Sequence, residues 1–177
     1  MVLNIDKEAP MFGRKVDPNE CHKVLQLLGC WSRAIATIDR ATDTMRLTMA
    51  QQPTGMQSKE FEKARLAALE VVAEIQKETM DPRFWPILED NRGAKIMLDL
   101  QMKLNESYAH QLNLLNLYGV AADAFRSGRD AQSPSVKEMM SANKSFARVL
   151  DQMGAISGKL ARHYRISAQE YQSELRG

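Results

Sequence analysis

Hydrophobic residues recur with a helical period over four long stretches of this chain. From Val24 to Met49, and again from Val136 to Tyr164, they follow one another in alternating steps of three and four, the spacing of a heptad seam. Residues 58–80 and 91–127 carry broader apolar stripes of the same period. No segment alternates apolar and polar residues beside hairpin dipeptides. The pattern therefore predicts an all-α fold.

The two heptad seams predict the side chains that hold the helices together. The expected packing residues are Val24, Leu28, Trp31, Ile35, Ile38, Phe146, Leu150, Met153, Gly154 and Gly158. Such regular seams suit either coiled-coil-like packing inside one bundle or contacts between copies in a homo-oligomer or larger complex. The sequence leaves these alternatives open.

Two glycines four residues apart stand near the end of the last seam. Small residues at this spacing let a neighbouring helix approach closely, but each Gly also costs about 1 kcal/mol of helix propensity relative to Ala. The segment therefore either packs tightly or frays. Whether the helix continues through Gly154 and Gly158 is open at this point.

The segments between these four stretches, with the capping patterns beside them, predict where the helices begin and how many there are. Three capping boxes mark helix starts, at Asp17 with Glu20, Ser135 with Glu138 and Ser167 with Glu170. We expect an elongated antiparallel bundle of about four long helices plus a short C-terminal helix. Residues 1–16 form an N-terminal arm, residues 17–127 the first three helices, and residues 134–177 a fourth helix with a basic C-terminal segment.

Composition narrows the class of protein. The 177 residues are 44% hydrophobic and 26% charged, which suits one folded domain, and the formal net charge is only +2. No apolar run approaches the ~20 residues of a membrane span, and the first residues lack a signal-peptide core. Cys21 and Cys30 would lie about 13 Å apart on one helix, too far for a disulfide. We expect a reduced cytoplasmic protein with no membrane partner.

The chain offers few residues for catalysis. His22, His110 and His163 do not follow a Glu at the Glu-x-x-His spacing of di-metal bundles, and no phosphate loop is present. Cys21 stands beside His22, but no third group completes a nucleophilic system. We therefore expect a protein without enzymatic activity, metal, cofactor or small-molecule substrate.

Positive charge gathers near the C-terminus. Residues 134–177 hold seven cations against four acids, and Lys159, Arg162, His163 and Arg165 cluster without an acid between them. Such a cluster can neutralise nucleic-acid phosphates, or it can be a solvated helix end that favours cations. The two interpretations are about equally supported by the sequence.

The last residues also have the pattern of a helix-turn-helix. Residues 160–164 would form the first helix, Ile166 the turn and residues 168–175 a second helix capped by Ser167. Its polar residues Gln169, Gln172 and Arg176 could then face a nucleic-acid groove. Arg165 takes the turn position that usually holds Gly, and no further helix follows in the sequence to support the pair.

This part of the chain resembles the small terminase subunits of tailed phages. The resemblance rests on residues 133–137 (SPSVK), on Ala142 and Lys144, and on residues 164–168 (YRISA), and it covers about 44 residues. Members of one such family close with a Gly-Leu-Thr-Pro-like turn, whereas residues 165–168 here read RISA, without the Gly and the Pro. The resemblance implies a ring-forming subunit that binds DNA and presents it to a packaging ATPase, in the host cytoplasm.

Two functions follow as expectations. The first is a helical subunit of a nucleoprotein assembly that binds DNA or RNA through its basic C-terminal segment. The alternative is a scaffold or chaperone-like interaction module without nucleic-acid binding, in which the apolar seams bind partner helices.

Overall fold

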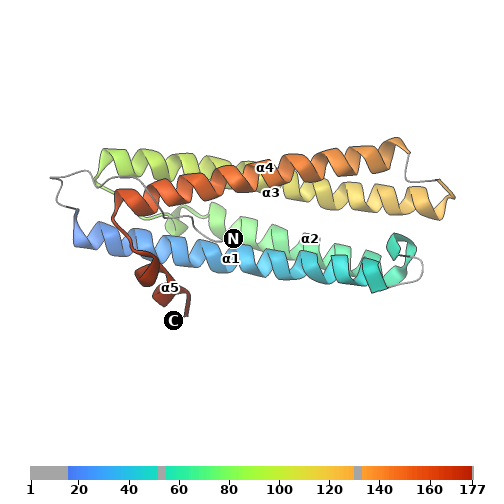
Figure 1. Cartoon of the computed structure of the whole chain (residues 1–177), viewed down its shortest axis with the longest axis horizontal. Coiled ribbons are helices and arrows are strands. Elements are labelled where there is room, and N and C mark those ends of the chain that lie inside the picture. The colour runs from blue at the N-terminus through green and yellow to red at the C-terminus, as the bar shows by residue number, and fades with distance from the viewer. Residues whose placement is uncertain (1–15, 52–54, 130–132, 177) are drawn as a thin grey trace.

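Five α-helices follow one another in the computed structural model, which describes residues 16–51, 55–129 and 133–176 (Figure 1). They are α1 (Pro18–Gln51), α2 (Lys59–Met80), α3 (Asn91–Arg126), α4 (Pro134–His163) and α5 (Ala168–Arg176). Two short 3-10 turns, η1 (Gly55–Gln57) and η2 (Pro82–Phe84), lie on either side of α2. The predicted all-α class is confirmed. Of the predicted arm, only Val16 belongs to the described residues.

The four long helices run alternately up and down the long axis of the molecule (Figure 1). Helix α1 packs against α2, α2 against α3 and, most extensively, α3 against α4, whereas α1 and α4 have few contacts. The short helix α5 leaves the end of α4 and crosses α1. This is the elongated antiparallel bundle that the periodicity predicts.

The two heptad seams face the inside of the bundle. Buried positions of the predicted set are Val24, Leu28, Trp31, Ile38, Met153 and Gly158, while Ile35, Phe146, Leu150 and Gly154 are half-buried. Helix α4 runs without interruption through both glycines. Because these apolar positions pack within one chain, the seams are accounted for by internal packing.

Helix starts agree with the predicted capping boxes at one of three positions. Ser167 and Glu170 form the expected reciprocal pair, since the Ser167 N–H donates to Glu170 Oε2 at 2.7 Å and the Glu170 N–H to Ser167 Oγ at 3.2 Å. The box at Ser135 is wrong because α4 starts at Pro134, with Ser133, two residues before Ser135, at its N-cap. Asp17 does accept the Asn19 N–H at 2.9 Å, but Glu20 bonds elsewhere, as described below.

Candidate nucleic-acid interface

The C-terminal helix pair begins where α4 ends. After His163 the chain turns through Tyr164 and Arg165, and Arg165 adopts a φ of 56°. This is the left-handed region that glycine adopts at low cost and other residues adopt only under strain. The turn therefore has an arginine in a backbone conformation that usually favours glycine.

Helix α5 is held against α1. The Tyr171 side chain is 4% exposed and its hydroxyl bonds the hydroxyl of Ser32, while Arg33 Nη1 donates to the Glu174 carbonyl at 3.1 Å. A Cβ built on Gly29 would lie 2.6 Å from Glu174 Cγ, so the glycine makes room for this contact. The helix that supports the C-terminal pair is therefore α1, from the other end of the sequence.

The predicted nucleic-acid contacts divide into exposed and enclosed residues. Lys159, Arg165, Gln169 and Gln172 are exposed, and Arg162 is half-buried. The side chain of Arg176 lies outside the described residues. The His163 side chain is only 5% exposed and its Nε2 forms a hydrogen bond with Asp90 Oδ2, so it joins α4 to α3 and does not contribute to an outer surface.

Asp90 makes this junction possible because it caps α3. Its Oδ2 accepts the Gly93 N–H at 2.8 Å while the same oxygen contacts His163 Nε2. A carboxylate at a helix N-terminus meets unpaired N–H groups and the positive end of the helix dipole. The start of α3 and the end of α4 are thereby fixed side by side, which places Arg92 and Lys95 at the same end of the bundle as Arg162 and Arg165.

Glu20 is the buried centre of a second junction at this end. It is 5% exposed and accepts the N–H groups of Glu89 and Asp90, the latter at 3.1 Å. The Tyr164 hydroxyl donates to its other oxygen at 3.2 Å. The capping-box interpretation of Glu20 was wrong because these partners, distant in sequence, take both carboxylate oxygens. The group joins α1, the start of α3 and the end of α4.

Cys21 lies beside this junction, and its Sγ is 3.5 Å from the Tyr164 carbonyl oxygen. Burial, with a smaller contribution from the charge of Glu170, raises the pKa of the Cys21 thiol. A raised pKa favours the thiol over the nucleophilic thiolate. The geometry thus gives Cys21 a packing role.

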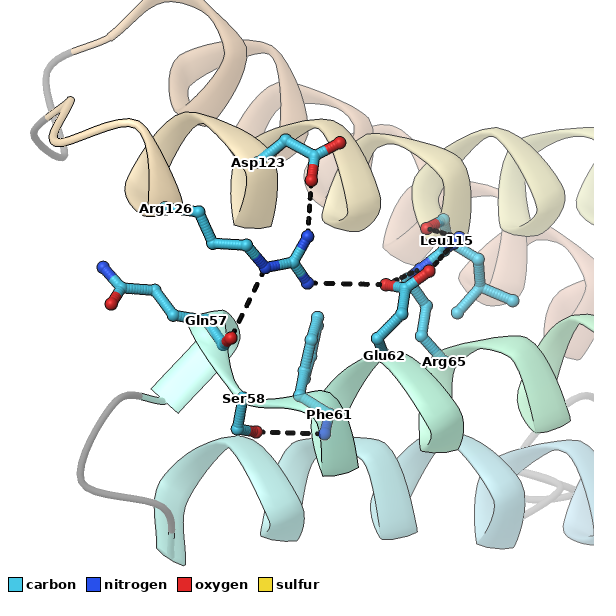
Figure 2. Close-up of polar contacts among 8 residues, drawn as sticks. All are labelled: Gln57, Ser58, Phe61, Glu62, Arg65, Leu115, Asp123 and Arg126. Atoms are coloured by element: carbon cyan, nitrogen blue, oxygen red, sulfur yellow. Dashed lines mark hydrogen bonds and ion pairs between the residues drawn. The ribbon is translucent and has the colours of Figure 1, made fainter.

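The opposite end of the bundle contains a polar network between α2, η1 and α3 (Figure 2). Arg65 donates to Glu62 Oε2 at 2.9 Å and to the Leu115 carbonyl at 3.1 Å. Arg126 lies 4.0 Å from Glu62 and donates to the Gln57 carbonyl at 3.4 Å. The hydrogen bond from Arg65 holds the pKa of Glu62 below its ordinary value. Gly119 permits this network, because a Cβ there would lie 3.0 Å from Arg65 Cζ.

Exposed cations also line the outer face of α4, which we call the α4 basic ridge: Lys137, Lys144, Arg148 and Lys159. At 3.6 residues per turn they fall within an arc of about 60° and extend over about 33 Å. Among the described residues no acid forms an ion pair with any of the four. The signal for this ridge in the sequence is the spacing of the four cations, seven, four and eleven residues, which places them on one face of a helix.

Two hollows flank α5 where it crosses α1. One, of about 940 Å³, is lined by residues of mixed charge that include His22, Arg33 and Glu170. The other, of about 320 Å³, lies between Trp31 and Tyr171. The Trp31 indole N–H has no hydrogen-bond partner among the described residues. The lining of the larger hollow also includes Ser167, whose hydroxyl donates to Glu170 Oε2 at 2.6 Å within the cap of α5.

The described residues contain no group of three or more His, Cys, Asp or Glu side chains arranged to hold a metal ion. Within the same ranges, no helix combines the length and the apolar character needed to cross a membrane. Comparison with protein-family models, curated proteins and solved structures found no match to this chain.

Proposed function

We propose that this protein binds nucleic acid through the α4 basic ridge and the adjoining turn between α4 and α5, and that it does so without catalysis. The observation that carries the proposal is the alignment of Lys137, Lys144, Arg148 and Lys159 on one exposed helix face. Arg162 and Arg165 extend this surface toward the C-terminal pair. A row of exposed cations matches the regular negative charge of a phosphate backbone.

The dimensions of the ridge favour a duplex. Its length of about 33 Å is close to the ~34 Å of one turn of B-DNA. Contacts of this kind read the backbone and not the bases, so binding would be largely independent of sequence. Exposed Gln169 and Gln172 on α5 are the side chains that could add base contacts, because amide groups pair with base edges.

The proposal predicts how steeply the affinity for nucleic acid falls as salt concentration rises. Each neutralised phosphate contributes about −0.9 to the slope of log K against log salt. Four contacts would therefore weaken binding on the order of 100-fold between 50 and 200 mM salt. An affinity that does not change with salt concentration would contradict a phosphate interface.

The test compares two triple variants with matched chemistry. Lys137→Ala, Lys144→Ala and Lys159→Ala remove three exposed charges from the ridge, whereas Lys59→Ala, Lys63→Ala and Lys77→Ala remove three from α2. Affinity for a 30-bp duplex and for single-stranded RNA is measured by fluorescence anisotropy at several salt concentrations. The variant with three substitutions in the α4 basic ridge should lose most of its affinity, and its slope of log K against log salt should become shallower by the contribution of about three phosphate contacts. The α2 variant should keep the affinity and the salt slope of the parent. Equal affinity of the two variants would refute nucleic-acid binding by the α4 basic ridge.

A phage DNA-packaging small subunit is the narrowest form of this proposal. It requires a closed ring of many copies, in addition to DNA binding. Mass measurement by light scattering tests this point directly. A ring-sized mass would support it, and a monomer or dimer over the accessible concentration range would contradict it while leaving nucleic-acid binding intact.

A further inference from the structure

The outer face of α3 carries a stripe without charge, which we call the α3 outer stripe. Its members are Leu98, Met102, Asn105, Ala109, Asn113, Asn116 and Val120, and all are exposed. They fall within an arc of about 80° at 3.6 residues per turn. The stripe includes three large hydrophobic side chains, Leu98 at 54%, Met102 at 64% and Val120 at 52% exposure.

This stripe lies on the side of α3 away from the core. The buried residues Leu100, Leu104 and Leu115 occupy the opposite face of the helix, so the bundle itself leaves the stripe uncovered. Exposed helix faces in a chain with 26% charged residues ordinarily carry charge. An uncharged exposed stripe of about 33 Å is typical of a surface that another helix covers.

The spacing along the stripe reads the same in both directions. From Leu98 to Val120 the steps are four, three, four, four, three and four, with Ala109 at the centre. Two copies of α3 that cross antiparallel at Ala109 would therefore place Leu98 opposite Val120 and Asn105 opposite Asn113. A two-fold axis requires such a self-complementary pattern, and the small Ala109 side chain lets the two backbones approach.

The charges beyond the stripe obey the same symmetry. Lys95 precedes Ala109 by fourteen residues and Asp123 follows it by fourteen. Antiparallel pairing thus sets the ammonium of one copy opposite the carboxylate of the other at both ends. A parallel pair would set Lys95 against Lys95, which is unfavourable. Asp123 is 74% exposed, although it also contacts Arg126 of its own helix.

We infer that the α3 outer stripe is a homodimer interface, in which α3 of a second copy of this chain packs antiparallel about a two-fold axis through Ala109. The occupant is a second copy because both the spacing and the end charges are complementary to themselves. The inference stands apart from nucleic-acid binding, which uses the outer face of α4. It accounts for three of the eight large hydrophobic side chains that the described residues expose.

The first experiment measures mass against concentration by sedimentation equilibrium. The 177-residue chain should approach twice its monomer mass as concentration rises, a result that would also contradict the closed ring of a packaging subunit. Ala109→Glu sets two like charges on the axis and should weaken association at least tenfold. The matched control is Ala73→Glu, at another exposed alanine in the interior of α2, and it should dimerise as the parent does. A parent that stays monomeric at 200 μM, or an Ala109→Glu variant that dimerises normally, overturns the inference.

The second experiment tests the register and the antiparallel direction. In a background with Cys21→Ser and Cys30→Ser, a single Ala109→Cys substitution should form a disulfide-linked dimer with copper phenanthroline as the oxidant. Leu98→Cys alone should not, because its symmetry mate lies about 33 Å away. Combining Leu98→Cys with Val120→Cys should restore cross-linking. Efficient cross-linking through Leu98→Cys alone would indicate parallel pairing and overturn the proposed geometry.

Discussion

Gly93 lies directly against the ring of Tyr164. A Cβ built on Gly93 would stand 2.7 Å from Tyr164 Cζ, well inside van der Waals contact, and would clash with the hydroxyl oxygen as well. The glycine is in the first turn of α3 and the tyrosine follows the last turn of α4. Their contact lets the Tyr164 hydroxyl reach Glu20, and it explains why a glycine occupies this helical position.

Gly93→Ala should therefore destabilise the protein. Helix propensity alone would make this substitution stabilising by about 1 kcal/mol. We expect the opposite sign, a loss of about 2 kcal/mol, because the methyl group displaces a tyrosine that is 2% exposed. Urea unfolding followed by circular dichroism measures the change. A gain in stability would show that the ring moves aside at little cost.

Glu20→Ala should cost about 3 kcal/mol in unfolding free energy. It leaves two backbone N–H groups, of Glu89 and Asp90, and the Tyr164 hydroxyl without their common acceptor. Asn19→Ala, at the exposed neighbouring position, is the control and should change stability by less than about 0.5 kcal/mol. Equal effects of the two substitutions would mean that water replaces the carboxylate.

Stability should fall in acid partly through Glu62. Its folded-state pKa is lowered, chiefly by the hydrogen bond from Arg65, so its stabilising contribution is fully present above the ordinary glutamate pKa. The contribution is lost as pH falls from 4.5, the ordinary glutamate pKa, through the lowered folded-state pKa. The difference in unfolding free energy between the parent and Glu62→Gln should accordingly shrink between pH 6 and pH 3. A constant difference over this range would indicate that packing, and not charge, is lost in the variant.

The turn at Arg165 makes a comparison of two substitutions informative. Arg165→Gly and Arg165→Val both remove the guanidinium, but only glycine adopts a φ of 56° without strain. The glycine variant should be more stable than the valine variant by about 1–2 kcal/mol. Thermal unfolding of both proteins gives this difference. If the two unfold together, the turn adopts another conformation in solution.

Periodicity predicted the bundle because an apolar face must be buried, whichever neighbour covers it. The seam residues Val24, Leu28 and Met153 were found in this way. Periodicity does not identify the helix that covers an apolar face. The packing of Tyr171 against α1 therefore does not follow from the sequence pattern. The spacing of the α4 basic ridge was present in the sequence and could have been recognised there.

Short sequence patterns give the wrong interpretation of a side chain when its hydrogen-bond partners are distant in the sequence. Glu20 sits at capping-box spacing from Asp17, yet its hydrogen bonds reach Asp90, 70 residues away, and Tyr164. His163 reads as one of a group of surface cations, but its ring contacts Asp90 across the helix pair. In both cases the competing contact is tertiary, and only the assembled fold brings it into reach.

The hydrogen bond between Glu20 and Tyr164 spans 144 residues of a 177-residue chain. During synthesis the first helix emerges long before the residue that completes its end of the bundle. The hairpin of α3 and α4, whose contacts are close in sequence, can form earlier than this closure. Ribosome-bound chains that stop short of Tyr164 should thus lack the hydrogen bond to Glu20 that joins α1 to the end of α4.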